Sequence, residues 1–230
     1  MFKLKKHFFN AMANEFFKGK LYSGDFKGLM PRYYTPRYKK YIIEETKLLK
    51  QKISGRILEA GVGIGRLIPV LAPRATELVG IDNSAFMLKK SREVAASFSN
   101  VRVLKADLEN LSVYFPFHYF DYSLCLWNTL GNVRHPIKAL KELAAVTDHS
   151  IFTSVFYKKT IKERIKFYKA VDVKVLKIDQ ITETFYLDGF VSQSFDEHDI
   201  QKLATRAGLY VKESAILGGV VLWSELERQS

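Results

Sequence analysis

Residues 57–67 read Ile57-Leu58-Glu59-Ala60-Gly61-Val62-Gly63-Ile64-Gly65-Arg66-Leu67. An apolar run ends in a glutamate, three glycines follow at a spacing of two, and the apolar pattern then resumes. This order predicts a buried strand, a tight turn and the start of a helix. Glycine is needed where the backbone takes a positive φ or where a ligand approaches too closely for a Cβ atom. The turn is therefore typical of a loop that presses against a bound nucleotide-like molecule.

The residues around the glycines indicate which kind of ligand the turn suits. A dinucleotide fingerprint, G-x-G-x-x-G/A, would need glycine or alanine where this chain has Arg66. A phosphate-binding loop would need Gly-Lys-Ser/Thr, which is also absent from the stretch. The acidic Glu59, two residues before the first glycine, favours a ligand with an ammonium group over a pyrophosphate.

Length and composition limit the class of protein. The chain has 230 residues, of which 47% are apolar, so it can form one globular domain with a sizeable core. Its single cysteine, Cys125, excludes an internal disulfide and a cysteine-based zinc site, and we expect no bound metal. No apolar run reaches the roughly 18 residues of a membrane span. We expect a cytoplasmic protein without a signal peptide.

The net charge of +12 is concentrated in two segments. Residues 1–52 carry 13 Lys and Arg against four Asp and Glu, and residues 156–177 carry eight against two. Phe9, Met12 and Phe16 share one face of an amphipathic basic segment at residues 1–20. This segment is expected to be either a lid over the site or a helix on a membrane surface. The basic segments indicate an anionic partner.

From residue 56 onward the pattern alternates between strand and helix, which predicts a parallel sheet with helices on both faces. A helix at about 35–51 precedes the first strand. Strands are expected near 56–60, 77–81, 101–105, 119–126 and 150–156, and helices near 64–72, 84–97 and 136–146.

After the fifth strand we expect an insert. The basic stretch 157–171 predicts a helix with Ile161, Ile165 and Tyr168 on one face. The elements expected after it are a hairpin at 173–178 and 181–187, a helix that ends near 207, and two antiparallel strands at 209–214 and 219–224.

Polar residues follow the predicted strands at their carboxyl ends, where ligands bind in open α/β sheets. Asp82 ends the second strand and can accept hydrogen bonds from two ribose hydroxyls. Asp107 ends the third strand and can accept from an adenine amino group, while Leu108 offers a backbone N–H. The glycine turn and the two acids together predict an adenosine-containing ligand.

These motifs, in this order, resemble those of class I S-adenosylmethionine (SAM)-dependent methyltransferases. Residues 78–84 with Met87 are similar to the second motif of the family, residues 103–108 to the third, and residues 120–131 to the fourth. The resemblance implies a Rossmann-like, doubly wound α/β fold. Its seven-stranded, mostly parallel sheet would have an antiparallel C-terminal strand, helices on both faces, an N-terminal helical lid and an insert after strand five. One domain would span 1–230, with a lid at 1–52, a SAM-binding core at 55–156, an insert at 157–190 and a C-terminal helix and hairpin at 191–230.

The resemblance also implies which residues would bind the cofactor and the acceptor. Glu59 would face the methionine amino group, and Trp127 and Asn128 would lie near the transferring methyl. Arg37, on the helix before the first strand, is the candidate for the SAM carboxylate. The full expected cofactor set is Glu59, Gly61, Val62, Gly63, Gly65, Asp82, Asn83, Met87, Asp107, Leu108, Trp127, Asn128 and Arg37. The candidate acceptor contacts are Tyr33, Tyr34, Tyr38 and Thr129.

The expected activity is methyl transfer from SAM to a small-molecule, anionic acceptor by in-line displacement. The donor is already activated, so alignment and exclusion of water can carry most of the catalysis, and no catalytic base is assigned. Three alternatives stay open: an RNA methyltransferase that holds phosphates with the basic segments, a membrane-surface enzyme acting on a lipid or quinone, and a SAM-binding protein without catalysis.

Overall fold

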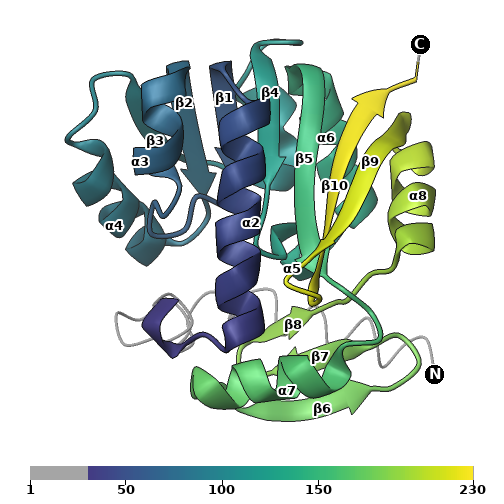
Figure 1. The fold of residues 1–230 in the computed structure, drawn as a ribbon. Helices are drawn as coiled ribbons and strands as arrows, with labels where there is room; N and C mark the ends of the chain where they lie inside the picture. The colour runs from purple at the N-terminus through teal and green to yellow at the C-terminus, as the bar shows by residue number, and fades with distance from the viewer. Residues whose placement is uncertain (1–30, 230) are drawn as a thin grey trace.

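Alternating strands and helices form a seven-stranded sheet in the computed structural model, which describes residues 31–229 (Figure 1). Its strands are β1 (Gly55–Ala60), β2 (Ala75–Asp82), β3 (Val101–Lys105), β4 (Phe120–Cys125), β5 (Thr147–Phe156), β9 (Leu209–Leu217) and β10 (Val221–Arg228). Their order across the sheet is β3-β2-β1-β4-β5-β10-β9. The first five strands run parallel, and β10 pairs antiparallel with both β5 and β9. The predicted α/β fold is confirmed.

Helices cover both faces of the sheet, as predicted. They are α2 (Pro36–Lys52), α3 (Ile68–Leu71), α4 (Ala85–Ala95), α5 (Thr129–Asn132), α6 (Pro136–Val146) and α8 (Glu197–Arg206). Short 3-10 helices are η3 (Pro31–Tyr33), η4 (Ala72–Arg74) and η5 (Leu108–Val113).

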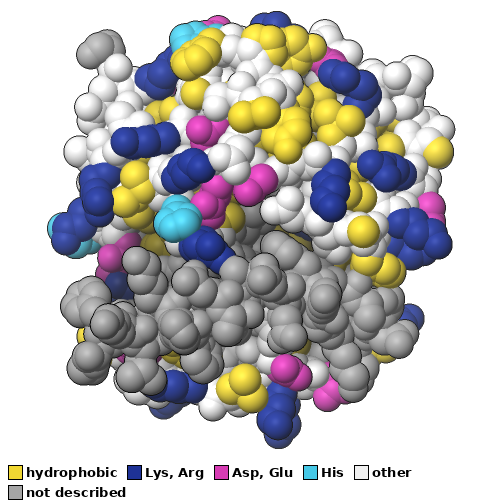
Figure 2. Space-filling model, turned by 180° about the vertical axis from the view of Figure 1, so that it is seen from behind, with side chains coloured by type: hydrophobic (Ala, Val, Ile, Leu, Met, Phe, Trp, Pro, Cys, Tyr) yellow, Lys and Arg dark blue, Asp and Glu magenta, His cyan; other side chains and the backbone are white. Residues whose placement is uncertain are grey.

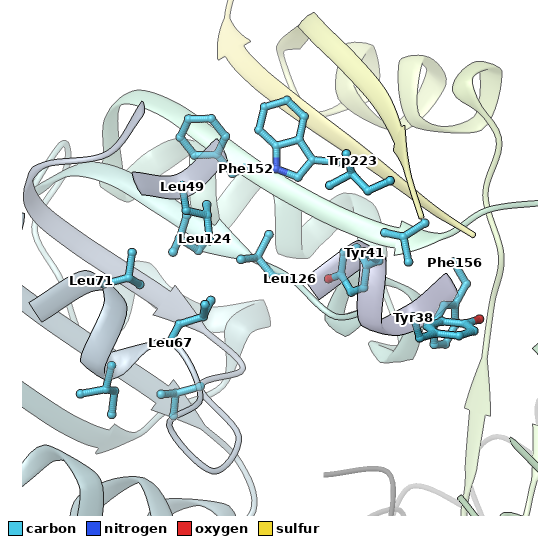
Figure 3. Packing of buried hydrophobic residues seen from close by; sticks show 14 of the residues in the cluster. Tyr38, Tyr41, Leu49, Leu67, Leu71, Leu124, Leu126, Phe152, Phe156 and Trp223 are labelled. Atoms are coloured by element: carbon cyan, nitrogen blue, oxygen red, sulfur yellow. The ribbon is translucent and has the colours of Figure 1, made fainter. Parts of the chain in front are cut away.

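Two apolar clusters fill the space between the sheet and its helices. Successive strand residues point to opposite faces, so Ile57 enters one cluster and Leu58 the other. The first cluster joins the strands to α2, α3 and α4, and Figure 3 shows Tyr41 and Trp223 among its side chains. The second joins them to α6 and α8 through residues such as Leu140. The sheet is therefore buried on both sides, as a doubly wound fold requires.

The insert between β5 and α8 has one strand more than the sequence predicted. It consists of α7 (Ile161–Ala170) and an antiparallel sheet of β6 (Val175–Asp179), β7 (Thr184–Leu187) and β8 (Phe190–Ser192). The expected hairpin lacked β8, a strand of three residues that follows a turn at Gly189, where φ is 93°. Figure 1 shows the insert lying beyond the carboxyl ends of the parallel strands.

Two further predictions need correction. The buried face of α7 contains Arg164, Phe167 and Tyr168, whereas Ile165, predicted on the apolar face, is 41% exposed. The helix expected from residue 64 begins only at Ile68, because Gly65 in the turn before it has a φ of +82°.

The amphipathic segment predicted at residues 1–20 lies outside the described residues. Within residues 31–229, no helix is both long and apolar enough to cross a bilayer.

Candidate active site

The polar side chains selected from the sequence lie at the carboxyl ends of β1, β2, β3 and β4, the edge of the sheet beyond which the insert lies (Figure 1). Parallel strands bring their carboxyl ends to one edge, so residues distant in sequence meet there. This edge is the candidate active site.

Glycine is needed for different reasons at the three positions of the turn after β1. All have positive φ, namely 81° at Gly61, 55° at Gly63 and 82° at Gly65. A Cβ atom on Gly61 would lie 2.5 Å from Thr129 Oγ1, and one on Gly65 would lie 2.9 Å from Ile68 Cδ1. A Cβ atom on Gly63 would meet no heavy atom of the described chain within 4 Å. Protein packing therefore requires Gly61 and Gly65, whereas Gly63 leaves its backbone open to a ligand.

Backbone hydrogen bonds fix the turn to β2. The amides of Gly61 and Val62 both donate to the Ile81 carbonyl at 2.9 Å. Val62 is buried against Gly80, where a Cβ atom would lie 2.7 Å from Val62 Cγ2. The Val62 side chain thus fills space that Gly80 provides, and the turn presents its backbone rather than its side chains.

Glu59 is a buried carboxyl group with an unpaired oxygen. The residue is 6% exposed, and Oε2 has no hydrogen-bond partner among the described residues. Burial raises the pKa of Glu59 to about 8, the Arg66 guanidinium opposes this rise, and Glu45 and Asp82 add to it. A buried, unpaired carboxyl oxygen costs free energy, so this atom marks a place for a hydrogen-bond donor from a ligand.

Asp82 connects the ends of β1 and β2. Its Oδ2 accepts from the Gly63 amide at 3.0 Å and its Oδ1 from the Ser84 amide at 2.8 Å. Burial raises its pKa, and these backbone hydrogen bonds, together with one from Asn83, oppose the rise. A carboxylate has about four acceptor sites, so these three amide donors leave Asp82 about one site for a ligand hydroxyl.

The other predicted adenosine contacts lie at the next strand ends. Ser84 caps α4 by accepting from the Met87 amide at 3.3 Å, and Met87 is buried. Asp107 caps η5 by accepting from the Glu109 amide at 2.9 Å, and Leu108 beside it is buried. The predicted adenosine contacts therefore lie in the first turns of α4 and η5, at the carboxyl ends of β2 and β3.

Trp127 lies in an aromatic cluster just after β4. Its ring stacks between Tyr34 and Tyr41, with centroid distances of 5.0 and 5.3 Å. Its φ is 53°, and its amide donates to Ser154 Oγ at 2.8 Å. A non-glycine residue held at positive φ stores strain, which surrounding contacts must support. The Tyr41 and Ser154 contacts provide that support.

Asn128 and Thr129 use their side chains for contacts within the protein. Asn128 is 1% exposed, accepts from the Phe156 amide at 2.9 Å and donates to Ser192 Oγ at 2.9 Å. The Thr129 hydroxyl donates to the Leu126 carbonyl at 2.8 Å. Asn128 thus ties the end of β4 to β5 and to the insert.

The three tyrosines predicted to contact the acceptor differ in exposure. Tyr38 is fully buried, and its ring lies against Trp127 and Phe167. Tyr34 is 6% exposed, and burial raises its pKa to about 12. Tyr33 ends η3, with the Arg32 guanidinium 4.9 Å from its ring centroid. Because burial disfavours the phenolate, Tyr34 is a poor general base.

Arg37, the predicted partner of the SAM carboxylate, contacts the insert. Its Nε lies 3.9 Å from Glu163 Oε2 of the insert, and its side chain is 55% exposed. Its Nη1 lies near Gly219 in the turn between β9 and β10.

Three residues of the site were missed in the sequence. Glu45 of α2 is fully buried and accepts from Arg66 Nη2 at 2.7 Å and from Ser154 Oγ at 2.8 Å. Two of them could have been found from the sequence. Glu45 shares the helical spacing of Tyr38 and Tyr41, and Ser154 is a polar residue within an apolar strand. Arg66 had served only to exclude a dinucleotide fingerprint.

Comparisons with known proteins agree on the class of this domain. Residues 57–150 match the family model described as a methyltransferase domain. A segment of 71 residues is 31% identical to phosphoethanolamine N-methyltransferase 3 of Arabidopsis thaliana. That segment is 31% of this chain but spans only 14% of the plant protein.

Solved structures share the fold at low sequence identity. The PH0226 protein of Pyrococcus horikoshii OT3 is 21% identical, with a TM-score of 0.66, over 87% of this chain and 96% of that one. The magnesium protoporphyrin IX methyltransferase of Synechocystis PCC 6803 with bound SAM is 16% identical, with a TM-score of 0.61, over 91% and 94% of the two chains.

Proposed function

We propose that this protein, which carries a class I S-adenosylmethionine-dependent methyltransferase domain, methylates a small-molecule acceptor that bears negative charge. The observation that carries the proposal is the buried, unpaired Glu59 oxygen at the end of β1, together with the open backbone of Gly63 in the turn that follows.

The residues at the strand ends fit SAM. Glu59 would take the ammonium group, Asp82 a ribose hydroxyl, and Asp107 with Leu108 the adenine. Gly63 would let the cofactor approach the backbone. When bound, SAM supplies a methyl group on a positively charged sulfur.

The role of the protein in the reaction is then to align the methyl donor with the acceptor and to exclude water. The buried rings of Tyr34 and Tyr38 and the partly buried ring of Trp127 form an aromatic wall just after β4. The high pKa of Tyr34 favours an acceptor atom that arrives deprotonated and needs no base from this wall.

A covered site favours a small acceptor over a polymer. The insert lies beyond the carboxyl ends of the parallel strands, on the side of the candidate site (Figure 1). The face seen in Figure 2 carries Lys and Arg side chains dispersed among acidic ones rather than gathered in one patch. An RNA-binding groove would favour a continuous basic stripe. The net charge of +12 supports an anionic acceptor, and the names of both methyltransferase relatives refer to small-molecule substrates.

Transfer of labelled methyl from SAM to separated cell fractions tests this proposal. We expect label in the small-molecule fraction, retained on an anion exchanger, and no label with Asp82→Ala. Label that appears instead in the RNA or lipid fraction would contradict a small-molecule acceptor.

A further inference from the structure

A buried ion pair lies directly at the glycine turn. Arg66 is the residue after the third glycine, and its Nη2 is 2.7 Å from Glu45 Oε2. The Glu45 side chain is fully buried and that of Arg66 is 24% exposed. The pair therefore links α2 to the turn and leaves part of the Arg66 side chain exposed.

The Arg66 guanidinium keeps donors for a ligand. Arginine has five N–H donors in a planar fork, and among the described residues one hydrogen bond, to Glu45, is recorded for it. Its charge opposes the rise that burial causes in the pKa of the Glu59 carboxyl and of the Tyr34 hydroxyl. In the sequence, Arg66 and the unpaired Glu59 oxygen flank the same glycine turn.

A carboxyl group before a turn and a guanidinium after it match an α-amino acid group. Such a group carries an ammonium and a carboxylate on one carbon, and each must find a partner when it leaves water. Glu59 can serve the ammonium. The carboxylate then needs a cation, and a planar guanidinium is the side chain that binds carboxylates in two-point fashion.

We propose that Arg66, and not Arg37, binds the carboxylate of the methionine end of SAM, and that Glu45 is a positioning residue that orients Arg66. This rests on the proposed cofactor site. Glu45 is itself fixed by Ser154 Oγ at 2.8 Å and by the Tyr41 hydroxyl. The same Ser154 accepts from the Trp127 amide, so one network holds both Arg66 and the aromatic wall.

Decarboxylated SAM is the probe that isolates this contact, because it keeps the adenosine, sulfonium and ammonium groups and lacks only the carboxylate. Arg66→Met alone would leave Glu45 buried without its partner, so the test variant is Arg66→Met/Glu45→Gln, which removes both charges. Arg37→Met is the matched control. Affinities for both ligands are measured by calorimetry on the cofactor-free protein.

We expect the double variant to bind SAM about 10- to 100-fold more weakly than the wild-type chain does. Its affinity for decarboxylated SAM should equal that of the wild type, and Arg37→Met should change neither affinity. An equal loss for both ligands, or no loss for either, would overturn the assignment of Arg66 and leave the proposed function intact. Wild-type protein that binds neither ligand would overturn the proposed function itself.

Discussion

The buried Glu59 carboxyl is expected to bind the SAM ammonium group, and its charged form lowers the free energy of unfolding. Its pKa of about 8 in the folded protein lies well above the ordinary value of 4.5, chiefly because the carboxyl is buried. Between these values the folded protein holds a proton that the unfolded chain releases. The free energy of unfolding therefore falls as the pH rises through this window. A bound ammonium group would offset the cost of the charged form.

Glu59→Gln should separate these two effects. The amide stays neutral, so the cofactor-free variant should lack the loss of stability that the wild type shows between about pH 5 and pH 8, on the order of 3 kcal/mol. The variant should also bind SAM more weakly at neutral pH. Urea unfolding at both pH values, with and without SAM, measures this. Parallel pH profiles for the two proteins would contradict the assignment.

Gly63→Ala tests whether the open backbone is where the cofactor approaches. The substitution places a side chain at a φ of 55°, which costs about 1–2 kcal/mol. If a ligand occupies the adjacent space, SAM affinity should also fall by about tenfold or more.

Gly208→Ala is the matched control for this prediction. Gly208 has a φ of +79° and, like Gly63, a Cβ on it would meet nothing of the described chain within 4 Å, but it follows α8. The Gly208→Ala variant should lose about as much stability as Gly63→Ala and keep the SAM affinity of the wild type. Calorimetry and thermal unfolding compare the two variants, and equal SAM affinities would refute the role of Gly63.

At the scale of the elements, the packing of the insert depends on a buried arginine of α7 in addition to apolar side chains. The Arg164 guanidinium lies between the rings of Phe156 and Phe185, at 4.4 and 4.3 Å from their centroids. Nη2 donates to the Ser192 carbonyl at 2.9 Å and to the Tyr168 hydroxyl at 3.0 Å. These contacts join α7 to β8 and to the end of β5.

Arg164→Met should loosen the insert and leave the main sheet intact. The substitution keeps an apolar stem and removes the charged donor to the Ser192 carbonyl and the Tyr168 hydroxyl, at a cost of about 1–3 kcal/mol. Hydrogen exchange should accelerate over residues 161–192 and stay unchanged over 55–125. Lys169→Met, an exposed change on the same helix, is the control. Uniform acceleration across the chain would contradict a local role.

Prediction from the sequence succeeded for elements with local patterns. The parallel strands, the helix at Pro36 and the helix from Pro136 to Val146 follow from periodicity, proline and turn residues that lie close together in sequence. β8 was missed because three residues are too few to show a period. Arg164 was missed because a single arginine in a basic helix is expected to be exposed.

At the scale of the whole molecule, the sheet gathers separate motifs at one edge and the insert covers that edge (Figure 1). The sequence could predict that Glu59, Asp82 and Asp107 meet there, because parallel strands align their carboxyl ends. It could not predict that Glu45 joins Arg66 and Ser154, since these partners lie 21 and 109 residues away. Contacts between residues so far apart in sequence depend on how α2 packs on the sheet.

We expect SAM to bind at the carboxyl ends of the parallel strands through Asp82. Calorimetric titration of SAM into the folded, ligand-free protein tests it most directly, with Asp82→Ala as the test variant. Asp121→Ala is the control, because Asp121 also accepts from a backbone amide, that of Arg56, at 2.7 Å, but lies at the start of β4. We predict wild-type binding at one site per chain, weakened about 10- to 100-fold by Asp82→Ala and unchanged by Asp121→Ala. Absence of binding to the folded wild-type protein, or equal effects of the two substitutions, would contradict it.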